Sequence, residues 1–398
     1  MDLVMKKIFP LSKNACTLVA LVQSMSIVFV GIALAREPGL PGDEEFIYLP
    51  RLHAYQVADS EFYAQFLRLC DLEAAKLKDE NSKDPFFIDS YGVRALCAAY
   101  DMTGNMKYLD AARSWSERMV RFQEKMNPAG AYYMNYGRKP GEPKGDWYVA
   151  DCSSIAMGVL ATAVRCNGTE QKRFLNSVQH FASLVMKNYV RPSGGVTDGL
   201  WPEFDEEWWC SSALFGSLSF LLYKNMGDER YLNVALGVVD WLNKLDLSNV
   251  QQPLPLSRQG PAMPMYVLEG YSAGWQYMSK DSARKEAASA QILWCLNWIA
   301  DQQQKPVSQR EWQLTASHAQ HTGWWGAKYG GLPFHQYIFS RYFARQDLMI
   351  AADREMRQLA KIAFADENSF TQLQSFMMIS YAERLNPGAI YRAIEQKH

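Results

Sequence analysis

The sequence has no excess of either charge. It carries 41 Lys and Arg against 42 Asp and Glu, a net charge of −1 over 398 residues. Binding to nucleic acid needs a basic patch or stripe. The charge balance therefore predicts that neither DNA nor RNA is a partner, whereas 48% hydrophobic residues are enough for an ordinary globular core.

Metal-binding and nucleotide-binding motifs are also scarce. The 7 Cys include no CxxC pair, the spacing that zinc sites commonly use. No P-loop, GxSxG or GxGxxG stands in the context of strand and helix that those motifs require. We therefore expect no metal and no cofactor, and the sequence argues against serine hydrolases and nucleotide enzymes.

The first 35 residues are typical of an export signal or a membrane anchor. Three Lys precede an apolar run that ends in Ala33-Leu34-Ala35, the small-x-small pattern that signal peptidases prefer. At about 20 residues the run is also long enough to cross a bilayer uncleaved. We predict a signal peptide or anchor over 1–35, a Pro- and Gly-rich linker over 36–44 and a single folded domain over 45–398. The protein is then periplasmic or secreted, with an uncleaved anchor as its only membrane contact.

Apolar residues recur at helical spacing through most of the chain, and strand patterns are scarce. One turn also recurs, in Gly104–Leu109, Gly168–Leu175 and Gly227–Leu232. A helical pair that repeats every ~50–65 residues indicates a superhelix or a closed ring. The predicted helices run approximately over 57–78, 86–102, 105–125, 151–166, 169–189, 209–225, 228–244, 263–279, 281–302, 331–344, 346–363 and 369–385.

Alternate helices differ in character. Those such as 86–102 and 151–166 are apolar nearly all round and rich in small residues, as buried helices must be, whereas 105–125 carries charge on one face. The long, aromatic connections between the pairs favour a ring over a superhelix of short repeats. The sequence therefore predicts an all-α fold, an (α/α)6 toroid in which six inner helices lie within six outer ones. The six Cys after the leader fall mostly in apolar helical patterns, so we expect buried free thiols.

The long connections run from outer to inner helices, over 127–150, 190–208, 248–262 and 303–330. Ordinary helix connections have about 2–8 residues, so these are expected to be functional. Aromatic side chains and carboxylates suit sugars, since pyranose faces lie against rings and hydroxyls meet polar groups. Plain loop packing and a protein partner site remain alternatives. The predicted partner is an oligosaccharide, and its predicted contacts from these loops are Tyr133, Trp147, Tyr148, Trp208, Trp209, Trp324 and Trp325.

Acids at the starts of inner helices are the catalytic candidates. Asp89 opens one predicted inner helix and Asp151 the next, 62 residues later. Glycosidic chemistry needs a carboxyl group that donates a proton and a second that activates water or acts as nucleophile. The structural alternative is helix capping. Five further acids precede the third inner helix: Asp198, Glu203, Asp205, Glu206 and Glu207. The four that lie close together are interpreted mainly as a solvated turn, with Glu206 or Glu207 as additional catalytic candidates.

The histidines offer hydrogen bonds and no complete metal site. His318 and His321 stand three residues apart, and one loop supplies too few ligands for a metal. We predict that His321 and His335, at the start of a later inner helix, contact the sugar, with ordinary loop bonds as the alternative.

With Asp89 in Ile-Asp-Ser-Tyr-Gly and Asp151 in Ala-Asp-Cys-Ser-Ser, the chain after its leader resembles the six-hairpin glycosidase superfamily. Within it the chain is most similar to the unsaturated glucuronyl and rhamnogalacturonyl hydrolases. The resemblance implies hydrolysis of a 4,5-unsaturated uronic acid at the end of an oligosaccharide. In that chemistry the acid matching Asp151 protonates the C4=C5 bond and then draws a proton from the water added at C5, while Asp89 fixes the sugar or the water.

One segment departs from that family. Those hydrolases usually open the next inner helix with Arg-Gly-Gln-Ala/Gly-Trp, where this chain has Trp209-Cys-Ser-Ser-Ala. A polysaccharide lyase or uronyl epimerase on the same fold therefore stays open, with Tyr133, Tyr148 or His321 as the base of a lyase. A non-catalytic glycan-binding envelope protein is the alternative from another class.

Overall fold

The structure is a computed structural model that describes residues 60–80, 84–142, 147–199, 206–248, 260–278, 281–310, 324–365 and 372–394. For Ser60, Trp324 and Trp325 it describes the backbone alone. All these residues belong to one compact unit, Glu45–Ile394. The predicted leader and linker, 1–44, lie outside the described residues. Within the described part, no helix is both long and apolar enough to span a bilayer.

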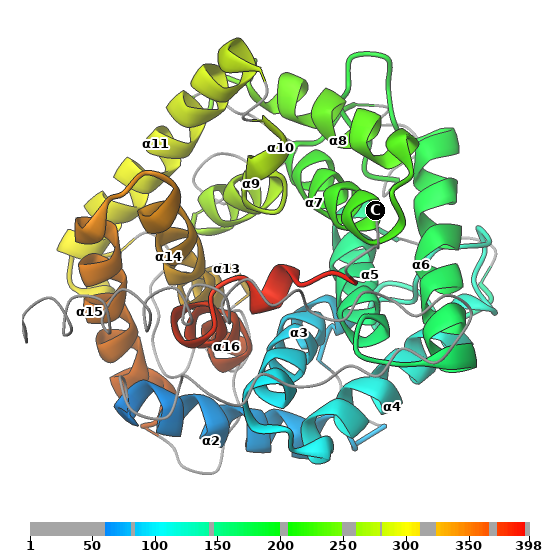
Figure 1. Cartoon of the computed structure of the whole chain (residues 1–398), viewed down its shortest axis with the longest axis horizontal. Coiled ribbons are helices and arrows are strands. Elements are labelled where there is room, and N and C mark those ends of the chain that lie inside the picture. The colour runs from blue at the N-terminus through cyan, green and yellow to red at the C-terminus, as the bar shows by residue number, and fades with distance from the viewer. Residues whose placement is uncertain are drawn as a thin grey trace, which may run out of the picture. The chain divides into compact units, whose positions relative to one another are not determined.

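Twelve main helices form two concentric rings, with the inner helices crowded round the centre (Figure 1). Each inner helix contacts the next, and the last contacts the first, so the inner ring is closed. The inner ring consists of α3 (Phe86–Thr103), α5 (Val149–Ala163), α7 (Trp209–Met226), α9 (Ala262–Ser272), α14 (Leu332–Tyr342) and α16 (Gln372–Leu385). The outer ring consists of α2 (Ser60–Lys76), α4 (Met106–Gln123), α6 (Gly168–Asn188), α8 (Glu229–Leu242), α11 (Ser282–Gln304) and α15 (Gln346–Ala363). The predicted all-α toroid is confirmed.

Small residues let the inner helices pack closely. A Cβ on Gly158 of α5 would lie 3.1 Å from both the Ser90 side chain of α3 and the Trp115 ring of α4. The repeated turn predicted from the sequence ends α3 and α7 with a left-handed Gly, Gly104 and Gly227, at φ of 67° and 70°. Glycine adopts that conformation without steric cost, so each inner helix can stop and turn back as an outer one.

One predicted helix end was wrong, and one predicted helix has a short turn before it. The helix expected over 263–279 ends at Ser272, and a separate short helix, α10 (Trp275–Met278), follows it. Gly274 lies at the break against the ring of Phe220, where any side chain would collide with that ring. The helix expected from 331 is preceded by a 3-10 turn, η3 (Lys328–Gly331). Periodicity does not resolve such tight turns, because they continue the apolar pattern of the helix beside them.

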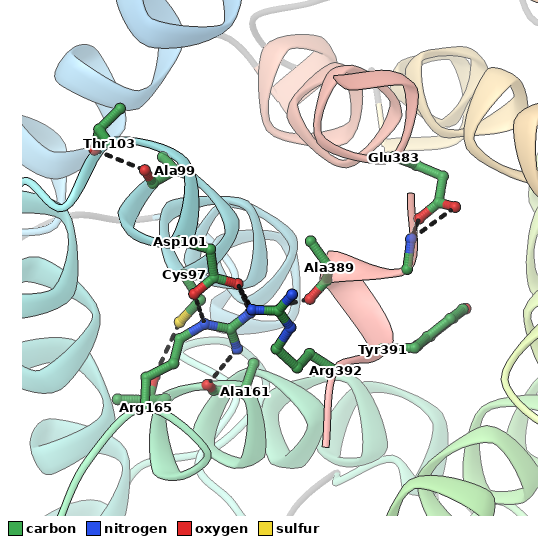
Figure 2. Close-up of polar contacts among 12 residues, drawn as sticks. Cys97, Ala99, Asp101, Thr103, Ala161, Arg165, Glu383, Ala389, Tyr391 and Arg392 are labelled. Atoms are coloured by element: carbon green, nitrogen blue, oxygen red, sulfur yellow. Dashed lines mark hydrogen bonds and ion pairs between the residues drawn. The ribbon is translucent and has the colours of Figure 1, made fainter. Parts of the chain in front are cut away.

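The C-terminal segment lies across the ring, beside the ends of the inner helices. Its short turn η4 (Ala389–Tyr391) runs over the centre in Figure 1. Arg165, after α5, donates to both carboxylate oxygens of Asp101 on α3, at 2.9 and 2.6 Å, and to the carbonyl of Ala389 at 3.0 Å (Figure 2). Lys224 of α7 donates to the carbonyl of Tyr391 at 2.9 Å. The segment therefore ties together the ends of α3, α5 and α7.

The six cysteines after the predicted leader are free thiols. Five are buried, and Cys210, the second residue of α7, is half-buried. The prediction of buried thiols is confirmed for the five.

Candidate functional site

Asp151 is the one residue of α5 that is not buried. It stands in the first turn, and its carboxyl accepts a hydrogen bond from the hydroxyl of Tyr136. Tyr136 is half-buried and stacks on Tyr148, with ring centroids 5.9 Å apart. The N-cap position of α5 belongs to Tyr148, so Asp151 does not cap the helix. Asp151 is instead partly exposed, at the end of the ring where the inner helix α5 begins.

The pKa of Asp151 is raised to about 8, chiefly because its carboxyl is removed from bulk water and secondly because Asp198 lies nearby. Lys328 acts in the opposite direction and lowers this pKa. At neutral pH the group is therefore held mainly in its protonated form. A carboxylic acid that keeps its proton near pH 7 is the property required of a general acid.

Asp198 lies in the connection between α6 and α7 and is buried. It is only 8% exposed, accepts a hydrogen bond from the hydroxyl of Ser211, and has its pKa raised to about 6 by burial. Its carbonyl accepts from the backbone N–H of Val149 at 2.9 Å, which fixes the connection to the start of α5. The acids that precede α7 therefore differ in their surroundings.

Two other acids that precede α7 differ from Asp198. Glu206 is exposed. Glu207 accepts hydrogen bonds from Ser193 and, at 2.6 Å, from the indole of Trp241, so it anchors the connection to α8. Glu203 and Asp205 lie outside the described residues.

Lys328 is a site residue that sequence reasoning missed. It opens η3, directly before α14, and is 3% exposed. Its ammonium nitrogen lies 5.5 Å from the ring centroid of Tyr266 and 5.7 Å from those of Phe87 and Phe376. Burial lowers its pKa to about 8, and Asp151 acts to raise it. A lysine within an irregular connection gives no periodic signal of burial, so only the position of the neighbouring glycines, Gly330 and Gly331, hinted at close packing.

Asp89 is placed differently from Asp151, although both stand in the first turn of an inner helix. Its Oδ1 lies 2.8 Å from the ammonium of Lys76 on α2, and its side chain is fully buried. Burial raises its pKa, and Lys76 opposes that effect. Asp89 is therefore paired with the outer helix α2. The catalytic role of Asp89 stays a prediction.

The predicted aromatic contacts divide into two groups. Trp147 and Trp209 are 4% and 2% exposed and pack against Tyr189 and Tyr266, so they belong to the core. Tyr133, Tyr148 and Trp208 are half-buried, and among them Tyr148 is linked to Asp151 through Tyr136. Tyr133 packs between Phe86 and Phe122. His321 and the side chains of Trp324 and Trp325 lie outside the described residues.

His335 is buried inside the ring. Its Nδ1 lies 3.3 Å from the hydroxyl of Ser272, and burial, with the nearby Arg94, lowers its pKa to about 3. It is therefore neutral at physiological pH. Arg94 pairs with Glu269 at 2.7 Å, and all three side chains are shielded from solvent. Ser272 lies in Gly270–Gly274, a GxSxG match at the end of a helix, which confirms that its context is not that of a nucleophile elbow.

No family model and no curated protein matches the sequence. Solved structures do share its fold. A family 76 glycoside hydrolase from a bovine Bacteroides thetaiotaomicron strain aligns with a TM-score of 0.57 at 14% identity, over 82% of this chain and 78% of that one. Cellobiose 2-epimerase from Bacillus thermoamylovorans B4167 aligns with a TM-score of 0.55 at 11% identity, over 82% of this chain and 100% of that one. A polysaccharide lyase aligns with a TM-score of 0.54 at 12% identity, over 81% of this chain and 97% of that one. The chain therefore shares the (α/α)6 toroid fold of these enzymes, and the predicted resemblance of fold is confirmed.

Proposed function

We propose that the chain is an exported carbohydrate-active enzyme, a glycoside hydrolase of uronic-acid-containing oligosaccharides, with Asp151 as its general acid. The observation that carries this proposal is the environment of Asp151. It is the single partly exposed residue of a buried inner helix, and burial together with Asp198 raises its pKa to about 8. Solved structures of the same fold include a glycoside hydrolase, which supports this reaction class.

The chemistry follows from a protonated Asp151 next to a 4,5-unsaturated uronate. Asp151 gives its proton to C4, and the hydroxyl of a water adds at C5. The Asp151 carboxylate then takes the remaining proton of that water and is restored. The product is a hemiketal at C5, which opens and releases the rest of the oligosaccharide. One acid thus serves both proton transfers, so no second reacting carboxyl is required.

Two neighbours prepare Asp151 for this role. Asp198 is itself ionised above its pKa of about 6, and its negative charge favours the protonated form of Asp151. The hydroxyl of Tyr136 holds the carboxyl in one orientation by donating a hydrogen bond to it. Both are positioning residues, since neither is required to exchange a proton with the sugar.

A polysaccharide lyase is the second candidate, and a specific observation favours it. Such an enzyme needs a base near C5 and a neutralised substrate carboxylate. The hydroxyl of Tyr136 donates to Asp151, and the positive charge of Lys328 acts on the same carboxyl. An epimerase on this fold would need a similar base. If the protein binds glycans without turning any over, it belongs to the non-catalytic class.

The deciding experiment is absorbance near 235 nm over time. Purified mature protein is mixed with intact and lyase-digested uronate polysaccharides and, as neutral substrates, α-mannan and cellobiose, whose products are followed by chromatography. Falling absorbance that Asp151→Asn abolishes supports the hydrolase. Rising absorbance identifies a lyase, and turnover of neutral substrates alone overturns the uronate assignment. Asp110→Asn, on the exposed face of α4, is the matched control.

A further inference from the structure

We propose that Lys328 forms a carboxylate-binding subsite beside Asp151, where its ammonium group takes the carboxylate of a uronic acid. This inference rests on the proposed function, because it assigns the substrate class of the same site. It concerns a residue that neither the sequence prediction nor the resemblance singled out.

The first argument is the place of Lys328 within the inner ring. Groups near the beginnings of all the other inner helices surround its side chain. Phe87 comes from α3, Tyr266 from α9 and Phe376 from α16, with ring centroids 5.5–5.7 Å from Nζ. Asp151 of α5 and Cys210 of α7 act on its charge. The ammonium therefore lies where the first turns of the inner helices converge.

The second argument is that the backbone of Lys328 is firmly held. A Cβ on Gly330 would lie 2.7 Å from the carbonyl oxygen of Leu373, and one on Gly331 would lie 2.7 Å from the side chain of Met265. The hydroxyl of Ser380 donates to the carbonyl of Gly330 at 2.6 Å. The two glycines thus let η3 press against α9 and α16. A cation on so rigid a support is preorganised for one position of its anionic partner.

The third argument is that the aromatic rings suit a buried cation. Ring faces carry negative potential and attract an ammonium group within about 6 Å of the centroid. Three such rings favour the charged form of Lys328, whereas burial lowers its pKa.

The fourth argument is substrate chemistry. In a 4,5-unsaturated uronate the carboxylate is attached to C5, and C5 is bonded to C4, where Asp151 delivers its proton. An acid poised over C4 therefore has the sugar carboxylate next to it. A neutral hexose carries an uncharged hydroxymethyl group at that place. A cation beside Asp151 consequently distinguishes uronates from neutral sugars, as charge complementarity does in other binding sites.

The kinetic test compares an oligouronide with its carboxyl-reduced form. Lys328→Met should lower the preference for the oligouronide, measured as the ratio of its kcat/KM to that of the reduced form, by about 100-fold, mainly through the KM of the oligouronide. Lys328→Arg should recover part of the loss, because it restores the charge. Lys187→Met, at an exposed position of α6, is the control. Equal losses on both substrates would show a merely structural role and overturn the proposal, with circular dichroism confirming that each variant is folded.

A binding measurement separates this proposal from the proposed function. Calorimetric titration of Asp151→Asn with sodium glucuronate or galacturonate, and with glucose as the neutral probe, needs no turnover. Uronate binding that is lost in the double variant Asp151→Asn with Lys328→Met supports the subsite, even if the protein hydrolyses nothing. Turnover that depends on Asp151 but is indifferent to Lys328 overturns the subsite and leaves the glycosidase in place. Uronate binding that survives Lys328→Met also overturns it.

Discussion

The ammonium nitrogen of Lys76 lies 2.8 Å from Oδ1 of Asp89 and 3.0 Å from Oε2 of Glu73. An outer helix thus supplies the counter-charge for an acid at the start of an inner helix. All three groups are largely shielded from solvent, and burial raises the pKa of Glu73 to about 8. Gly92 of α3 provides the space that Glu73 occupies, since a side chain there would collide with it. These contacts join α2 to α3, and through them Asp89 has a structural role.

The first prediction follows from this pair. Asp89→Asn should lower the free energy of unfolding by about 3 kcal/mol, because the ammonium of Lys76 loses its closest carboxylate in a buried place. We expect kcat/KM to fall by less than about tenfold, since Asp151 is untouched. Urea denaturation and substrate kinetics measure the two effects.

Asp84→Asn is the control, because that carboxyl lies farther from Lys76, at 3.4 Å, and its side chain is 35% exposed. A loss of activity as deep as that of Asp151→Asn, with unchanged stability, would restore Asp89 to a catalytic role.

The second prediction concerns pH. Asp151 must be protonated to act, so kcat/KM should decline as pH rises through about 8. Asp198 raises the pKa of Asp151 and Lys328 lowers it. Asp198→Asn should therefore move the decline to lower pH, and Lys328→Met should move it to higher pH. Cys210, whose pKa is well above its usual value, does not titrate in this range. Lys328, whose pKa is also about 8, does titrate there, so the profile is measured on the carboxyl-reduced substrate, which does not need the ammonium charge for binding.

The measurement is kcat/KM from pH 5 to pH 10, with Asp110→Asn as an unshifted reference. Opposite displacements in the two variants identify Asp151 as the titrating group. An alkaline limb that moves in neither variant would refute the assignment.

The third prediction is that Tyr136→Phe lowers kcat by about tenfold, because Asp151 loses the hydroxyl that orients it. The ring and its stacking on Tyr148 remain. A hydrogen bond donated to a carboxylate favours the ionised form, so its loss should also raise the pKa of Asp151 and extend activity to higher pH.

Tyr132→Phe is the matched control in the same connection, because its hydroxyl is paired with Ser177 at 2.7 Å and away from Asp151. It should leave the pH profile in place. If Tyr136→Phe also left the profile in place, the hydroxyl would have no part in positioning the acid.

The fourth prediction tests the C-terminal segment. Arg165→Met should destabilise the fold by about 3–5 kcal/mol, because it leaves the buried carboxylate of Asp101 without its closest cation. It also removes the bond to Ala389, so limited proteolysis should cut the segment after Leu385 faster. Calorimetry and a proteolytic time course are the measurements.

Arg173→Met is the comparison, since Arg173 pairs with Glu117 on the surface, where such pairs contribute less than about 1 kcal/mol. Equal stability of the two variants would mean that the segment does not hold the ring together.

Local signals in the sequence predicted the fold. The helical period, the turns at Gly104 and Gly227 and the small residues of the inner helices were sufficient to predict the toroid, because each of these signals arises between neighbours along the chain. The end at Ser272 and the 3-10 turn from Lys328 were not predicted, since contacts with distant helices decide where those turns form.

The site was predicted only in part for the same reason. Asp89 and Asp151 have the same position in two similar helices, and nothing in their spacing says that one meets Lys76 and the other Tyr136. Asp198 precedes a cluster of acids that begins at Glu203, and nothing along the chain indicates that its neighbours in space are Ser211 and the start of α5.

The sequence by itself determined which segments are helical, which of them are buried, and that two acids begin successive inner helices. Only the tertiary structure decided which acid keeps its proton and which cation stands beside it. Helical periodicity is a local property of the chain. The pKa of Asp151 depends on water exclusion and on the charges of Asp198 and Lys328, which belong to other segments and meet it only when the ring closes.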